Sequence, residues 1–226
     1  MGGKGSKAKA VGSPANGPVN VLGQQYVLSE RSALKMKQKF WSSWGNGDYQ
    51  VKDLDDKVWF VCDQKFWDLN NERSLLDGNG EVVCTALEKL ASVRSTWHIY
   101  QNGFRKATIA KKILSTKSWG EVYMVYVWDT PDTLDKFTKD SDTELDPYQP
   151  TLCIRTSFTG WGIEMFTLEA GKTEPTKDSV PWARTQETLS WRDVVLDAET
   201  YLLEVAPNVD IAFANMLTMI VAKDLD

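Results

Sequence analysis

The chain has 226 residues, three of them cysteine, and a net charge of −5 at neutral pH. This length suits one large domain or two small ones, and the negative charge does not favour nucleic acid as a general partner. An odd number of cysteines without a Cys-x-x-Cys pair argues against a disulfide framework and indicates reduced thiols in a cytosolic protein.

The first 25 residues contain six glycines, two prolines and no acidic residue, which predicts a disordered tail before a domain of residues 26–226. The run after Met1 is not apolar, so neither a signal peptide nor a transmembrane segment is expected. The opening, MGGKGS, matches the N-myristoylation pattern M-G-x-x-x-[ST]. Gly2 would carry the acyl chain once Met1 is removed. The alternative is a low-complexity leader that matches the pattern by chance.

A single myristoyl chain binds membranes only marginally, so stable attachment needs a second signal. Basic side chains near an anionic leaflet contribute roughly 1 kcal/mol each. The lysines of the tail that can supply this signal are Lys4, Lys7 and Lys9. The tail therefore predicts peripheral attachment to a cytoplasmic membrane face.

Most of the remaining chain has the pattern of β-strands. In residues 34–41, apolar side chains alternate with lysines, which indicates a half-buried strand with Lys35, Lys37 and Lys39 facing outward. Turn signals such as GNGD at 45–48 and DGNG at 77–80 separate strands every 8 to 12 residues, which indicates an antiparallel barrel or sandwich. The expected strands are 26–30, 34–41, 49–52, 58–62, 66–69, 74–76, 81–87, 97–100, 104–114, 119–128, 152–158, 161–168, 182–189, 192–196 and 201–205.

The last stretch, 208–222, is the one good helix, with Asn208 as its expected N-cap and Asp210 in its first turn. Its 14 mostly apolar residues from Val209 span roughly 21 Å, less than the ~30 Å hydrocarbon core of a bilayer. A helix this apolar and short usually lies inside a protein. We expect the strands to wrap around it. A helix packed on one face of a sheet and a membrane anchor are the alternatives.

Several motifs resemble the LURP-one-related family. They are VKD at 51–53, LDGNG at 76–80 and TWHIY at 96–100, which stand where that family has its repeated hairpins. The ending, YLLEVAPNVD at 201–210 followed by an apolar helix, is similar to the family's closing motif. Two positions depart from it, because Asn208 and Lys57 stand where the family commonly has glycine.

The resemblance covers about residues 26–225 and implies a relationship to Tubby C-terminal domains and phospholipid scramblases. It implies a mainly β fold, a closed antiparallel barrel of about twelve strands around a hydrophobic C-terminal helix. It also implies contact with lipid or phosphoinositide. It supplies no catalytic residue or cofactor.

A basic run, 105–117, contains no acidic residue. With the lysines of residues 34–41 it is a candidate surface for anionic lipid headgroups. Its candidate binding residues are Arg105, Lys106, Lys111 and Lys112. The alternatives are a solvated strand face and lysines that protect an edge strand.

An acidic segment, 129–146, has seven acids and two lysines. Its alternating carboxylates suggest calcium ligands, but the glycine of an EF-hand loop is missing, so a solvated loop is the favoured interpretation and no metal site is predicted.

No catalytic motif is present, and the single histidine, His98, is expected to be a surface or packed strand residue. We therefore expect a non-enzymatic, membrane-associated barrel module without a cofactor. Its expected partners are anionic membrane lipids and proteins that the sequence does not identify. The alternatives are a scramblase-like lipid transporter and a soluble interaction scaffold.

Overall fold

The computed structural model describes residues 10–37, 49–64, 72–89, 94–112, 120–128, 145, 148–157, 162–186 and 200–224. The helices are η1 (Gln24–Tyr26) and α1 (Ile211–Lys223). The strands are β1 (Val27–Leu28), β2 (Ser32–Lys37), β3 (Tyr49–Lys52), β4 (Val58–Gln64), β5 (Arg73–Asp77), β6 (Val82–Glu88), β7 (Thr96–Gln101), β8 (Phe104–Lys111), β9 (Val122–Val127), β10 (Leu152–Thr156), β11 (Ile163–Thr167), β12 (Ala183–Gln186), β13 (Thr200–Val205) and β14 (Val209–Asp210).

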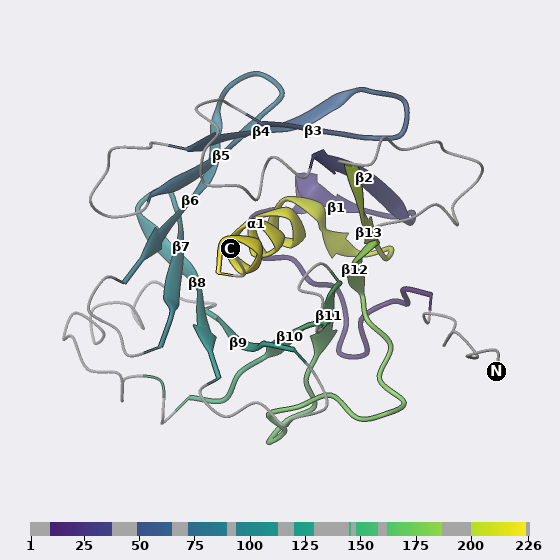
Figure 1. Cartoon of the computed structure of the whole chain (residues 1–226), viewed down its shortest axis with the longest axis vertical. Coiled ribbons are helices and arrows are strands. Elements are labelled where there is room, and N and C mark those ends of the chain that lie inside the picture. The colour runs from purple at the N-terminus through teal and green to yellow at the C-terminus, as the bar shows by residue number, and fades with distance from the viewer. Residues whose placement is uncertain are drawn as a thin grey trace, which may run out of the picture.

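Strands β2 to β13 form a closed antiparallel barrel in which each strand pairs with its neighbours in sequence (Figure 1). The barrel closes where β13 pairs with β2, with Leu203 opposite Leu34. Alternate residues point inward, as the period of two requires, so that Leu34 and Met36 are buried while Lys35 between them is half-buried on the outside. The predicted twelve-stranded barrel is confirmed.

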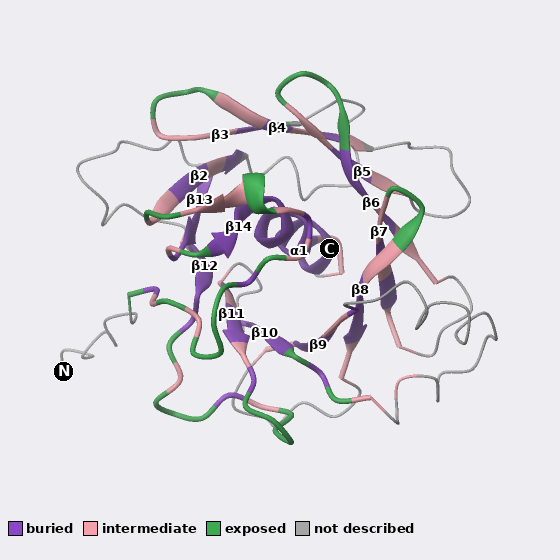
Figure 2. Cartoon of the chain, turned by 180° about the vertical axis from the view of Figure 1, so that it is seen from behind, coloured by how far each residue is buried: buried purple, intermediate pink, exposed green. Residues whose placement is uncertain are grey.

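Helix α1 runs through the middle of the barrel (Figures 1 and 2). Every residue from Ile211 to Ala222 is buried, so the helix offers no face to solvent. Among its polar side chains, Thr218 bonds within the helix, its Oγ1 donating to the carbonyl of Ala214 at 2.8 Å. The expectation of strands wrapped around the helix is confirmed, and neither the one-face packing nor the membrane anchor applies.

The start of the helix was predicted two residues too early. Asp210, not Asn208, is the N-cap, and its side chain accepts a hydrogen bond from the Phe213 amide. Asn208 has a φ of 63°, a left-handed conformation that a helix cannot continue from. Asparagine tolerates this conformation better than most residues, which explains how it replaces the family's glycine.

Residues 10–28, which we call the strap, close the barrel end where α1 begins (Figure 2). The strap is hydrogen-bonded to the barrel, with the Gly12 amide donating to the Pro181 carbonyl at 3.0 Å and the Val19 amide donating to the Asn208 carbonyl at 3.1 Å. Val11, Val19 and Leu22 are buried. The expectation of disorder over residues 1–25 is therefore wrong from residue 10 onward, because these apolar side chains pack into the core; residues 1–9 lie outside the described part.

Two further differences concern short strands. The strand expected at 26–30 is β1, which pairs with β14 outside the barrel, and β14 itself was not predicted because it has only two residues. The strands expected at 66–69 and 192–196 lie outside the described residues.

We call the end closed by the strap the strap end, and the opposite one, where α1 finishes, the C-terminal end.

Candidate functional site

The two groups of predicted lipid-binding residues lie on opposite sides of the barrel. Lys35 and Lys37 belong to β2, while the group from Arg105 onward belongs to β8 or directly follows it, and five strands separate β2 from β8 in either direction (Figure 1). The expectation that they form one basic surface is therefore wrong, because strands far apart in the order of a closed barrel face away from each other.

Three of these lysines have acidic partners. Lys35 Nζ lies 2.9 Å from Asp56, Lys111 Nζ lies 3.3 Å from Glu121, and Lys112 Nζ lies 2.5 Å from Glu174. Exposed pairs of this kind stabilise a fold by about 0–1 kcal/mol, but they reduce the local positive charge. Gly2, Lys4, Lys7, Lys9, Lys39 and the side chain of Lys37 lie outside the described residues.

Arg105 and Lys106 are placed differently, at the strap end of β8. A register shift in the β7–β8 pair puts Arg105 opposite Tyr100, and the guanidinium lies 6.0 Å from the Tyr100 ring centroid. Lys106 is half-buried, and its carbonyl accepts a hydrogen bond from the Trp128 amide. These are the two predicted basic residues that the structure brings together at the barrel end from which the tail leaves.

His98 is a packed residue on the outer side of β7. Its Nδ1 lies 3.1 Å from Thr108 Oγ1, which also accepts a hydrogen bond from Trp128 Nε1. Burial, with the charges of Arg105 and Lys89, lowers the pKa of His98 to about 3. The imidazole is therefore neutral at physiological pH.

The three cysteines are buried free thiols, as the sequence predicts. Burial raises the pKa of Cys153 to about 12 and that of Cys84 well above its usual value. A thiol of this kind is a small apolar side chain and not a nucleophile. Within the described ranges no group of three or more His, Cys, Asp or Glu side chains is arranged to hold a metal ion. Of the acidic segment 129–146 only Leu145 is described, so its relation to calcium stays a prediction.

The fully buried side chain of Asp210 connects the strap to the helix through hydrogen bonds. Oδ1 accepts from the Phe213 amide at 3.0 Å, while Oδ2 accepts from the amides of Leu22 at 2.6 Å and Val21 at 3.2 Å. Burial raises the pKa of this carboxyl, and the backbone donors oppose the rise. One side chain thus caps α1 and holds a segment almost the whole chain away in sequence.

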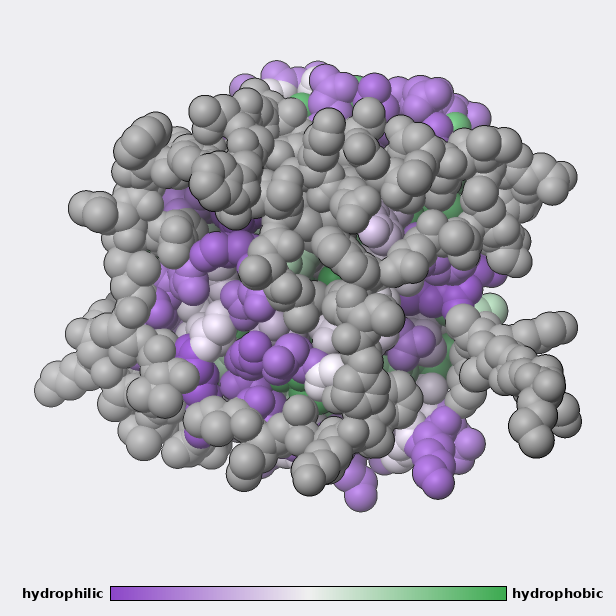
Figure 3. Space-filling view, viewed as in Figure 1, coloured by the Kyte–Doolittle hydropathy of each residue, from purple (hydrophilic) through white to green (hydrophobic). Residues whose placement is uncertain are grey.

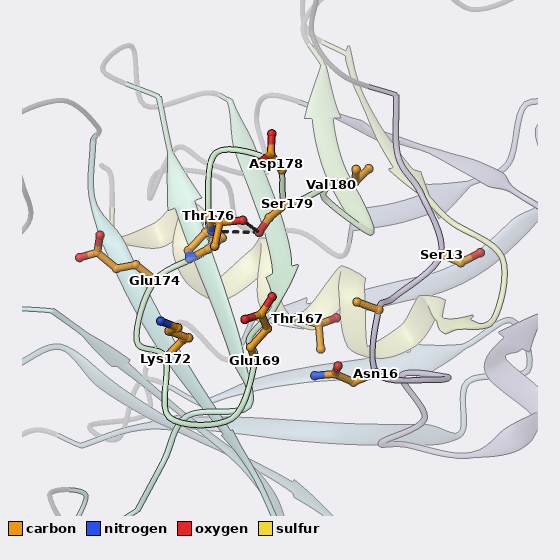
Figure 4. Close-up of a pocket in the computed structure, with 12 residues that line it drawn as sticks. Ser13, Asn16, Thr167, Glu169, Lys172, Glu174, Thr176, Asp178, Ser179 and Val180 are labelled. Atoms are coloured by element: carbon orange, nitrogen blue, oxygen red, sulfur yellow. Dashed lines mark hydrogen bonds between the residues drawn. The ribbon is translucent and has the colours of Figure 1, made fainter.

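Two pockets lie beside the strap. The smaller, which we call the polar pocket, has a volume of about 320 Å³. Figure 4 shows Lys172 and Glu169 directed toward it from the loop after β11, with Asn16 on the strap side. At its rim the Thr176 amide and hydroxyl bond to Ser179 Oγ at 2.9 and 3.0 Å.

The larger pocket has a volume of about 530 Å³ and lies between strap residues 16–21 and the strap-end parts of β9, β10 and β11. We call it the apolar pocket. The apolar side chains that give it this character are Pro18, Val19, Val21, Val127, Leu152 and Leu168. Glu169 is the only charged residue among its described lining residues. The sequence did not indicate this site, because it depends on the strap being ordered.

The surface at the C-terminal end has a different character. Seen from this end, the described surface is largely hydrophilic, and hydrophobic atoms lie recessed within the barrel (Figure 3). Lys223 closes the helix there, pairing with Glu88 and lying 4.7 Å from the Trp97 ring centroid. None of the described helices is both long and apolar enough to cross a membrane.

Comparison with known proteins gives a family match over most of the chain and a structural match over nearly all of it. A solved X-ray structure of a protein from Arabidopsis thaliana superposes with a TM-score of 0.57, covering 91% of this chain and 98% of that chain at 16% identity, which supports the fold alone. Protein LURP-one-related 15 of Arabidopsis thaliana is 29% identical over 58 residues, only 26% of this chain and 27% of that protein. The LURP-one-related family model matches residues 32–222. The chain therefore belongs to the LURP-one-related family.

Proposed function

We propose that the protein is a non-enzymatic peripheral membrane module. The acylated Gly2 and the tail lysines Lys4, Lys7 and Lys9 hold it on a cytoplasmic membrane face, and its strap end turns toward anionic phospholipid headgroups, phosphoinositides among them. The observation that supports this arrangement is the position of the first described residue, Ala10, at the same barrel end as Arg105 and Lys106.

The energetics favour several weak contacts acting together. One acyl chain is marginal by itself, and each basic residue near the leaflet adds about 1 kcal/mol. Arg105 and Lys106 would add about 2 kcal/mol, roughly thirtyfold in affinity. Strand β2, which carries Lys35, lies on another side of the barrel, so Lys35 would contribute little in this orientation.

Flotation of the full chain with vesicles tests the proposal. Two pairs of neutralising substitutions remove the same charge from opposite ends of the β8 segment: Arg105→Gln with Lys106→Gln, and Lys111→Gln with Lys112→Gln as the matched control. We expect the first pair to weaken binding to phosphatidylserine vesicles about thirtyfold and the second pair to change it little. Gly2→Ala should abolish stable flotation.

Unchanged flotation in both Gly2→Ala and the Arg105/Lys106 pair would contradict the membrane proposal and favour a soluble interaction scaffold. A labelled-lipid assay on the same vesicles addresses the scramblase-like alternative. Movement of lipid between leaflets would support that activity, whereas flotation without such movement supports a binding or adaptor role.

A further inference from the structure

The apolar pocket has a composition that suits a hydrocarbon ligand. Its volume, about 530 Å³, lies within the range of about 300–1,000 Å³ for small-molecule sites. The apolar side chains that leave surface open to a ligand are Pro18, which is exposed, and Val21 and Val127, which are half-buried and pack against the main core. Leu152 and Leu168 also line the pocket and are almost fully buried.

The charges that line the apolar pocket do not suit the anionic lipid headgroups that we expect to bind elsewhere at the strap end. No lysine or arginine lines the pocket among the described residues, and Glu169 is acidic, so a phosphate or carboxylate headgroup finds no cation there. The polar groups of the lining, such as Asn20, Gln149 and Thr151, are neutral. An uncharged apolar chain is therefore the ligand that this lining accepts at the lowest desolvation cost.

The chain itself carries such a group within reach. The strap that forms one wall of the pocket continues upstream to Ala10, and eight residue steps separate Ala10 from the acylation position, Gly2. An extended chain covers at most about 3.3–3.6 Å per residue, so these steps reach about 28 Å. Ala10 is itself only six residues from Asn16 on the pocket wall, which places the pocket within the range of the acyl chain.

We propose that the apolar pocket binds the myristoyl chain of the same molecule. This inference rests on the acylation in the proposed function and adds a regulatory state to it. With the acyl chain in the pocket the tail cannot anchor the barrel, and with the acyl chain in a bilayer the pocket is empty. Membrane affinity is then reduced by the fraction of molecules in the sequestered state.

Nuclear magnetic resonance tests the contact directly. The full chain is made with a co-expressed N-myristoyltransferase and ¹³C-labelled myristate, and intact mass verifies the acyl group. We expect nuclear Overhauser effects from acyl methylene protons to the methyl groups of Val127 and Leu168. An acylated protein that shows no such effects, with acyl signals at their solvent-exposed positions, would overturn the inference while leaving the membrane proposal intact. A chain that the transferase does not acylate would overturn both.

A pair of valine substitutions gives a second readout. Val21→Glu places a charge in the pocket, whereas Val82→Glu changes a valine that is 59% exposed and does not line it. If about 90% of the molecules sequester the acyl chain, Val21→Glu should raise vesicle binding about tenfold relative to Val82→Glu. Equal binding of the two acylated variants, each folded by circular dichroism, would count against sequestration.

Discussion

At the scale of single residues, we expect His98 to make the stability of the fold depend on pH between about 3 and 6.5. Its pKa is about 3 in the folded protein and about 6.5 in an unfolded chain. Because the unfolded chain binds the proton more tightly, the neutral imidazole contributes stability that is present above about pH 6.5 and is lost as the pH falls toward 3. His98 is the only histidine, so no other imidazole obscures this effect.

We expect His98→Asn, which keeps a polar atom near Thr108, to lose less stability on acidification than the wild-type chain. The pKa difference limits the stability that the wild-type chain loses through His98 between pH 6.5 and pH 4 to about 3 kcal/mol. The partial exposure of the ring reduces this loss to about 1–2 kcal/mol. Urea unfolding of both proteins across this pH range measures the difference. Parallel curves would show that the imidazole has the same pKa in the folded and unfolded states, which would contradict the prediction.

We expect the loss of the Asp210 side chain to destabilise the fold. Asp210→Ala leaves the amides of Leu22 and Phe213 without their acceptor in a buried place, which should lower the free energy of unfolding by about 3 kcal/mol. Asp178→Ala, at an exposed aspartate, is the control and should change it by less than about 0.5 kcal/mol. Equal unfolding midpoints for the two variants would contradict the role of Asp210 in connecting the strap to α1.

The sequence could not decide between Asn208 and Asp210 as the helix cap, since both residue types are good caps and lie two positions apart. The choice depends on the left-handed φ at Asn208 and on the strap amides that meet Asp210. Neither is encoded in the local pattern. The sequence likewise left open whether His98 is a surface or a packed residue, because a local strand pattern does not show that Thr108 lies beside its ring.

At the scale of elements, the strap shows where composition misleads. Its glycines and prolines predict disorder, and Pro14 and Pro18 interrupt the stretch between Val11 and Val19, so the few apolar residues do not indicate a helix or a strand. The strap is ordered by partners that are far away in sequence. One of them is Gln101, whose Nε2 donates a hydrogen bond to the Leu22 carbonyl at 2.6 Å. The apolar pocket was missed for the same reason, because one of its walls is the strap.

Two truncations test the strap as a structural element. A chain that starts at residue 10 should melt at the same temperature as the full chain. A chain that starts at residue 29 loses the buried side chains and the backbone bonds of the strap, which should cost about 4 kcal/mol and lower the melting temperature by about 10 °C. Equal melting of both truncated proteins in a calorimeter would mean that the strap adds nothing to stability.

At the scale of the whole molecule, alternation and turn signals predicted most strands, and the apolar ending predicted the enclosed helix. The prediction that the sheet closes into a barrel came from the family resemblance. The local pattern could not supply it, because the closing strands β13 and β2 pair residues as far apart in sequence as Thr200 and Lys37, a separation of 163 residues. The sequence did not correctly predict which basic residues share one surface of the barrel. Lysines that alternate on one strand face the same way, but only the strand order shows that β2 and β8 face apart.

The position of α1 has a consequence for how the protein is made. The segment that fills the interior follows all the barrel strands in the chain, and the closing strand β13 comes just before it, so a nascent chain first holds eleven of the barrel strands with nothing to wrap around. Folding of the barrel then waits until this segment has been synthesised. A premature stop before Ile211 would leave a hollow sheet for the quality-control machinery to degrade.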